Sequence, residues 1–77
     1  MTKKNFYLQL DEMLELDGGT IQGSEDLTGL PRWDSLAVMG FIALLDRNFG
    51  IRASGERITA CRTVADLLAL TGGKVSD

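Results

Sequence analysis

The 77-residue sequence contains no histidine, one cysteine and one proline. Without histidine, the chain lacks the most common general base and the most common metal ligand, so a Cys–His nucleophile pair and an imidazole zinc site are excluded. A single thiol, that of Cys61, cannot form an internal disulfide. So short a chain has little room for both a core and a substrate cleft, so we expect it not to be an enzyme and to hold no metal.

Long apolar runs are also absent. The longest stretch surrounds Ala43, Leu44 and Leu45 and is too short to span a bilayer. Two lysines lie near the N-terminus, but Asp11 and Glu12 interrupt the apolar region that a signal peptide requires. We therefore expect a cytoplasmic protein without stable membrane insertion.

The charged residues are mostly acidic and form no basic patch. Eleven Asp and Glu residues outnumber eight Lys and Arg residues, which leaves a net charge of −3. Nucleic-acid binding requires clustered Lys and Arg along a phosphate backbone, so no nucleic-acid partner is expected. Nothing in the sequence indicates an oligomer, and a monomer is expected.

Apolar residues recur at helical spacing, and no alternating segment is long enough for a convincing strand. The pattern predicts one all-α domain over residues 1–77, with a long loop between the first two of four helices. Gly18 and Gly19 predict the end of the first helix, and Thr63 with Asp66 predicts a capping box on the last. The expected helices cover roughly residues 4–16, 35–49, 54–60 and 63–71.

Ser35 stands where the long loop meets the second helix. Asp34 and Ser35 both belong to the residue types that cap helix N-termini, so on its own Ser35 is an ordinary cap. Taken with the long loop and the helical pattern, however, Trp33-Asp34-Ser35-Leu36 resembles the acyl carrier protein family, over residues 6–70. The resemblance implies a four-helix bundle of acyl-carrier type. It also implies that Ser35 receives covalent 4′-phosphopantetheine from coenzyme A, attached by a phosphopantetheinyl transferase.

The resemblance further implies roles for the residues around Ser35. Asp34 matches an aspartate that helps present the serine to the transferase. Leu36 and Met39, with Trp33 and Gly40, are expected to form an apolar contact surface for partner enzymes. Other interpretations stay open. Leu36 and Met39 could be partly buried under the loop, and Trp33 could be a core anchor. Gly40 could mark close approach of a partner or of the loop, or glycine could simply be tolerated there.

The second helix carries few acids after Asp34. Its outer positions include Ala37, Gly40, Asp46 and Arg47, so electrostatic steering toward basic partners should be weak. This favours an acyl carrier in a specialised lipid, polyketide or other secondary pathway over one of housekeeping fatty-acid synthesis. Its partners would be enzymes that load and process the cargo. Two alternatives remain, namely an aminoacyl or peptidyl carrier beside an adenylation enzyme, and a plain helical protein-interaction module.

Small residues outside the motif prompt two further expectations. Cys61 is interpreted as a small buried hydrophobic residue rather than a reactive thiol. Ala43, Ala53 and Ala60 lie on or near the second and third helices, where they would leave space for cargo between these helices and the loop.

Overall fold

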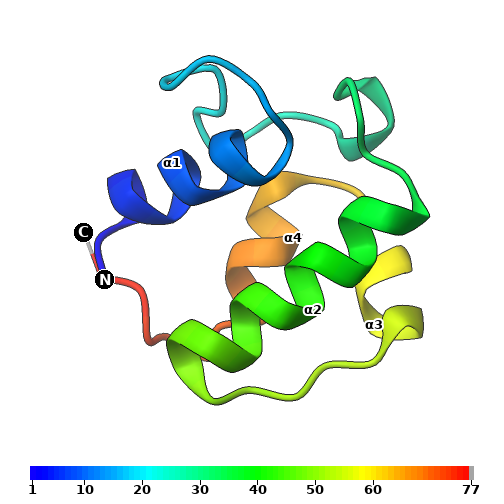
Figure 1. Ribbon diagram of the computed structural model, residues 1–77. Helices are drawn as coiled ribbons and strands as arrows, with labels where there is room; N and C mark the ends of the chain where they lie inside the picture. The colour runs from blue at the N-terminus through cyan, green and yellow to red at the C-terminus, as the bar shows by residue number, and fades with distance from the viewer. Residues whose placement is uncertain (77) are drawn as a thin grey trace.

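The computed structural model describes residues 1–76 and shows four α-helices and a 3-10 helix in this range (Figure 1). They are α1 (Lys3–Met13), the 3-10 helix η1 (Leu27–Gly29), α2 (Ser35–Phe49), α3 (Gly55–Thr59) and α4 (Val64–Ala69). The described residues form no strand, only two isolated bridges, Thr2 with Ser76 and Asp26 with Thr63. The expected all-α architecture with a long loop after the first helix is confirmed.

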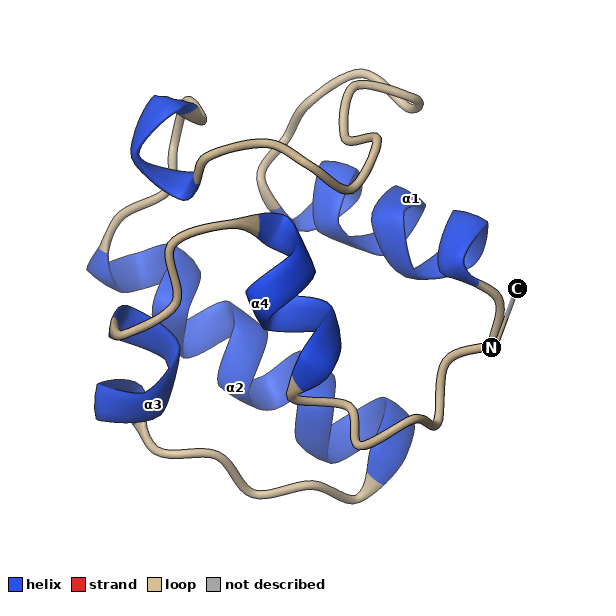
Figure 2. Ribbon diagram, turned by 180° about the vertical axis from the view of Figure 1, so that it is seen from behind, coloured by secondary structure: helices blue, strands red, loops and turns tan. Residues whose placement is uncertain are grey.

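The core is built around α2, the longest helix, which runs diagonally across the molecule and packs against α1 and α3 (Figures 1 and 2). Phe41 of α2 is fully buried and meets the ring of Phe6 from α1 edge-on, with centroids 6.1 Å apart. Burying one such side chain contributes roughly 1.5–3 kcal/mol. The buried apolar side chains are Phe6, Leu10, Leu14, Ile21, Leu27, Ala37, Val38, Phe41, Leu44, Leu45, Ala53, Ile58, Val64 and Leu67.

The first helix ends earlier than the sequence predicted. It stops at Met13, and Glu15 takes a left-handed conformation with φ 58°, so the paired glycines do not cap it. Leu14 is the last residue before this turn, and its side chain is buried in the core. The chain therefore turns as soon as Leu14 is packed.

The capping of the last helix follows the prediction. Thr63 accepts a hydrogen bond from the backbone N–H of Asp66, and the Asp66 carboxylate accepts one from the backbone N–H of Thr63. α4 itself is short and ends at Ala69. The helix was expected to reach residue 71, and Gly72 and Gly73, which both have positive φ, lie in the turn beyond it.

The long loop is anchored by the buried carboxylate of Asp11 in α1. Asp11 is only 1% exposed, and its two oxygens accept hydrogen bonds from the backbone N–H groups of Gly19 (2.9 Å) and Ile21 (3.0 Å). Charge-assisted bonds of this kind are stronger than neutral ones. Asp11 therefore fixes the first part of the loop against the helix from which it departs.

The second part of the loop is tied to the segment before α4. The N–H of Leu27 donates to the carbonyl of Arg62 at 2.8 Å, and the N–H of Val64 donates to that of Glu25 at 3.0 Å. Leu27 is buried, as expected of a loop anchor. The loop is thus held at both ends by hydrogen bonds and by apolar anchors, and it delivers the chain to α2 in a defined direction.

Candidate functional site

Ser35 is the first residue of α2, and Asp34 is the N-cap. The backbone of Asp34 is extended, and its Oδ1 accepts a hydrogen bond from the N–H of Ala37 at 2.9 Å. The Ser35 side chain is exposed, and its hydroxyl makes no hydrogen bond to any residue of the described chain. The interpretation of Ser35 as an ordinary cap is therefore wrong, because Asp34 performs that function and leaves the serine hydroxyl free.

The N-terminus of α2 favours a negative group at this position. The first N–H groups of a helix have no partner within the helix, and the helix dipole adds partial positive charge there. A phosphodiester on the Ser35 oxygen would gain about 0.3–1 kcal/mol from this field at an exposed position. The helix terminus thus modestly favours a phosphate-linked group on Ser35.

Leu36 and Met39 leave most of their side chains in solvent. They are 76% and 66% exposed, whereas the other exposed large apolar residues, Met1 and Leu8, are 37% and 38% exposed. They lie three residues apart on α2, so both flank the first turn of the helix that Ser35 begins. Burial under the long loop, the alternative interpretation, is therefore wrong.

Trp33 is an anchor of the loop. Its ring is half-buried and meets the ring of Phe41 edge-on, with centroids 6.5 Å apart. The structure therefore supports the core-anchor interpretation of Trp33. This packing fixes the chain immediately before Asp34 and so helps to set where Ser35 stands.

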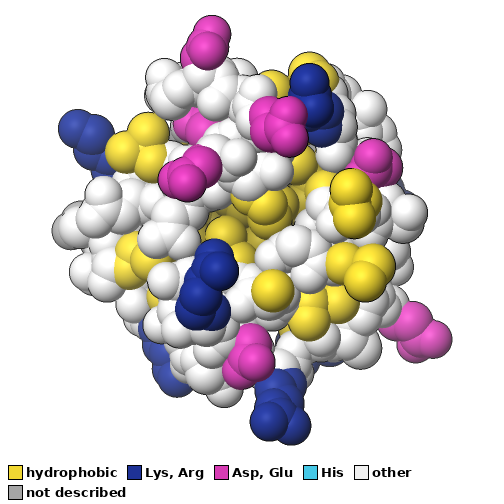
Figure 3. Space-filling model, in the orientation of Figure 1, with side chains coloured by type: hydrophobic (Ala, Val, Ile, Leu, Met, Phe, Trp, Pro, Cys, Tyr) yellow, Lys and Arg dark blue, Asp and Glu magenta, His cyan; other side chains and the backbone are white. Residues whose placement is uncertain are grey.

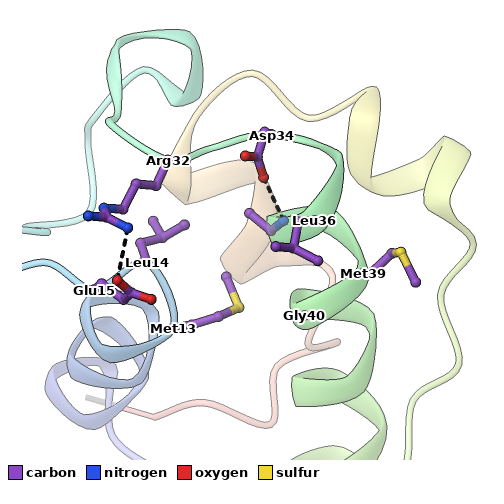
Figure 4. A pocket seen from close by; sticks show the side chains of 9 residues that line it. Met13, Leu14, Glu15, Arg32, Asp34, Leu36, Met39 and Gly40 are labelled. Atoms are coloured by element: carbon purple, nitrogen blue, oxygen red, sulfur yellow. Dashed lines mark hydrogen bonds and ion pairs between the residues drawn. The ribbon is translucent and has the colours of Figure 1, made fainter.

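Gly40 is covered by the first helix and not by the loop. A Cβ atom at Gly40 would lie 3.3 Å from Sδ of Met13, closer than ordinary van der Waals contact, and 3.4 Å from its Cγ. Figure 4 shows the Met13 side chain extending from α1 toward α2. Because Gly40 has no side chain, the Met13 side chain can pack against α2 at this position.

An open hollow of about 450 Å³ lies between the end of α1 and the start of α2 (Figure 4). Arg32 and Glu15 form an ion pair across its edge, with Nη1 and Oε2 2.8 Å apart. Figure 3 shows apolar atoms at the bottom of a depression on this face. The residues that line it are Met13, Leu14, Glu15, Arg32, Asp34, Leu36, Ala37, Met39 and Gly40.

The expectation about the three alanines is wrong. Ala53 is buried, whereas Ala43 and Ala60 are exposed, so the three do not enclose one interior space between α2, α3 and the loop. Ala43 instead lines a second hollow between α1 and α2. The open surface beside α2 is therefore on its α1 side.

Cys61 is half-buried rather than fully buried, and its Sγ contacts the carbonyl oxygen of Arg57 at 3.4 Å. Burial raises the pKa of its thiol, the nearby Asp66 carboxylate raises it further, and Arg57 offsets part of this effect. A thiol of raised pKa is a poor nucleophile at neutral pH. Cys61 thus fits the interpretation as a packing residue.

The fold and the free serine at a helix N-terminus together define a small helical domain suited to covalent attachment of a phosphate-linked group. Comparison with known protein families matches residues 10–71 to the phosphopantetheine attachment site family, and the chain belongs to that family. It is thus a carrier domain, of a generally non-catalytic class, that holds covalent 4′-phosphopantetheine. Searches among curated proteins and among solved structures found no match.

Two features of the site were missed by sequence reasoning. Met13 and the Arg32–Glu15 pair line the hollow beside Ser35, although nothing in their local sequence marks them. Helical periodicity can indicate that Met13 is buried, but not that it contacts Gly40 of another helix. Among residues 1–76, no helix is long and apolar enough to cross a membrane.

Proposed function

We propose that Ser35 carries the 4′-phosphopantetheine arm and that the chain holds acyl groups as thioesters on the terminal thiol of that arm. The observation that supports this proposal is the free, exposed hydroxyl of Ser35 at the start of α2, next to an aspartate that already caps the helix. The family match supports the cofactor but does not single out a residue. Ser35 is the residue whose position suits the modification.

The attachment is a transfer from coenzyme A by a phosphopantetheinyl transferase. The Ser35 oxygen forms a bond to the phosphorus of the phosphopantetheine moiety, and the pyrophosphate bond of coenzyme A breaks. Adenosine bisphosphate leaves, and a base of the transferase takes the hydroxyl proton. The carrier needs no base of its own, which agrees with its lack of histidine.

Partner enzymes would recognise the surface around Ser35. Leu36 and Met39 offer exposed apolar contact, Asp34 presents the serine, and Trp33 and Gly40 shape the surroundings through their packing. Exposed apolar residues grouped at one place favour protein contact. These five residues are proposed as the partner-binding surface of a single cytoplasmic domain over residues 1–77.

The pathway is proposed from the charges of α2. Asp46 and Arg47 are its only charged residues after the N-cap, so long-range attraction to basic partners is weak. This supports an acyl carrier of a specialised lipid, polyketide or other secondary pathway. The same observation keeps an aminoacyl or peptidyl carrier as the second candidate. An adenylating enzyme that loads amino acids onto the holo protein would favour that candidate.

Intact-mass measurement tests the central proposal. The chain is incubated with coenzyme A, magnesium and a phosphopantetheinyl transferase of broad specificity. We expect wild type and Ser24→Ala to gain the mass of one phosphopantetheine group and Ser35→Ala to gain none. Ser24 is the matched control because it is an exposed serine in the loop. Modification of Ser35→Ala, or no modification of wild type, would contradict the proposal.

A further inference from the structure

Two hollows lie in line between α1 and α2, the first beside Ser35, and Met13 packed on Gly40 lies between them. The first is lined by Asp34 and Leu36, which flank Ser35 in the chain. The second, of about 540 Å³, shares Met13 and Gly40 with the first and continues toward the other end of α2. Each hollow lies within the roughly 300–1,000 Å³ typical of ligand sites. We call the two together the α1–α2 groove.

We propose that the phosphopantetheine arm folds back from Ser35 and lies in the α1–α2 groove, with Met13 as an adjustable side chain at its centre. This inference rests on the proposed attachment at Ser35. It concerns where the arm resides when no partner enzyme holds it. An arm in this groove is positioned by α1 and α2 together, and partner binding at Leu36 and Met39 would compete for part of the same surface.

The groove is complementary to the arm in chemistry. The arm begins with a geminal dimethyl carbon and continues through two amides. The part of the groove next to Ser35 offers apolar contact from Leu36, Ala37 and Met13. Its far part offers the side-chain amides of Gln9 and Asn48, which already bond each other at 3.0 Å, and the guanidinium of Arg47. Apolar groups near the serine and hydrogen-bonding groups farther along follow the order of groups in the arm.

Small residues on α2 open the groove. Ala37 and Ala43 line it, and larger side chains at these two positions would fill it, whereas Met13 already occupies the space over Gly40. Methionine is flexible and adapts its shape to neighbouring groups, so Met13 can shift as the arm enters. Leu36 lies at the end of the groove next to Ser35, and Arg47 lies at its far end. These two residues are about 16 Å apart along α2, at the helical rise of 1.5 Å per residue.

On its other side, α2 packs against α3. Ile58 of α3 is fully buried, and Ala53 and Val38 are nearly so. A Cβ atom at Gly55 would lie 4.0 Å from Cγ1 of Val38, which is ordinary packing distance. Entry of the arm between α2 and α3 would have to separate these contacts, whereas the α1–α2 groove needs only a movement of Met13.

Isotope-filtered NMR tests this placement directly. Protein labelled with ¹³C and ¹⁵N is converted to the holo form with unlabelled coenzyme A, and intact mass confirms complete loading. We expect nuclear Overhauser contacts from the arm methyl groups to Met13, contacts from the distal part of the arm to the Gln9 and Asn48 side chains, and shifted amide signals for Gly40.

Two matched variants sharpen the test. Ala43→Leu fills the far part of the groove, whereas Ala65→Leu adds the same side chain at an exposed helical position outside it. Loss of the contacts to Gln9 and Asn48 is expected only in Ala43→Leu, with both variants keeping the amide spectrum of a folded chain. Contacts confined to residues 34–36, contacts to Val38 and Ile58, or equal loss in both variants would overturn the placement. If Ser35 gains no mass, the proposed attachment fails with it; full loading without groove contacts refutes the placement alone.

Discussion

Glu15 and Arg32 form an ion pair at 2.8 Å, and both residues have left-handed backbones, with φ of 58° and 68°. Glu15 ends the turn after α1, and Arg32 precedes the motif that contains Ser35. The pair is largely exposed and contributes at most about 1 kcal/mol. A left-handed conformation costs a residue other than glycine roughly 1–2 kcal/mol. For Glu15, the burial of the neighbouring Leu14 and Asp11 therefore helps to hold the conformation.

Substitution of Glu15 separates its charge from its backbone conformation. Glu15→Gln and Glu15→Gly both remove the ion pair, but only glycine tolerates φ of 58° without strain. We expect Glu15→Gly to be more stable than Glu15→Gln by about 1 kcal/mol in urea unfolding. Equal free energies of unfolding would show that this backbone is not strained.

Removal of the Asp11 carboxylate should destabilise the protein far more than removal of its neighbour. Asp11→Ala leaves the buried N–H of Ile21 and the N–H of Gly19 without acceptors, at a cost of about 3 kcal/mol. Glu12→Ala, at an exposed position, should change stability by less than about 0.5 kcal/mol. Urea unfolding gives both values, and faster amide hydrogen exchange at residues 19 and 21 would locate the effect. Similar losses in the two variants would contradict the role of Asp11.

Gly40→Ala tests the contact with Met13. Alanine favours the helix by roughly 0.5–1 kcal/mol, but its Cβ would lie 3.3 Å from Met13 Sδ. The gain should therefore be smaller in wild type than in Met13→Ala, where this neighbour is absent. A double-mutant cycle should give a coupling of at least about 0.5 kcal/mol. Additive effects would mean that Met13 moves aside without cost.

Acid should unfold the protein through carboxylates with lowered pKa values. Burial opposes ionisation of Glu25, but the N–H groups of Gln22 and Gly23 outweigh it and lower its pKa below the ordinary 4.5. The N–H groups of Arg62 and Thr63 lower the pKa of Asp66 below 3.8. As the pH drops below the ordinary pKa values of these groups, the unfolded chain binds more protons than the folded one. The free energy of unfolding therefore decreases as the pH decreases.

The free energy of unfolding should therefore change little from pH 7 to about pH 5 and decrease as the pH falls through 4. Urea titrations at several pH values measure this curve. Glu25→Gln and Asp66→Asn should each flatten the acid limb while lowering stability at pH 7. A decrease that begins above pH 6 would implicate other groups.

The Cys61 thiol should react slowly in the folded apo protein. Burial and the Asp66 charge raise its pKa above 9.0, so little thiolate exists at pH 8. We expect alkylation by iodoacetamide to be several-fold slower in the native chain than in urea. Equal rates would show that the thiol is neither shielded nor shifted.

Much of this molecule follows from local signals in the sequence. Helical spacing and capping residues such as Asp34, Thr63 and Asp66 act between near neighbours in the chain, so they are legible before any fold is known. The same holds for the motif around Ser35. These signals were sufficient to predict the α-helical class and the long loop, and they are the basis for proposing Ser35 as the attachment residue.

Other features depend on which distant segment lies beside each residue, and only the tertiary structure decided them. Asp11 is buried because the loop returns its N–H groups to α1. Met13 covers Gly40 because α1 crosses α2 at that point, and the two hollows of the α1–α2 groove flank this contact. Ser35 begins as one of two candidate caps in the sequence, and the bond from Ala37 to Asp34 leaves its hydroxyl free.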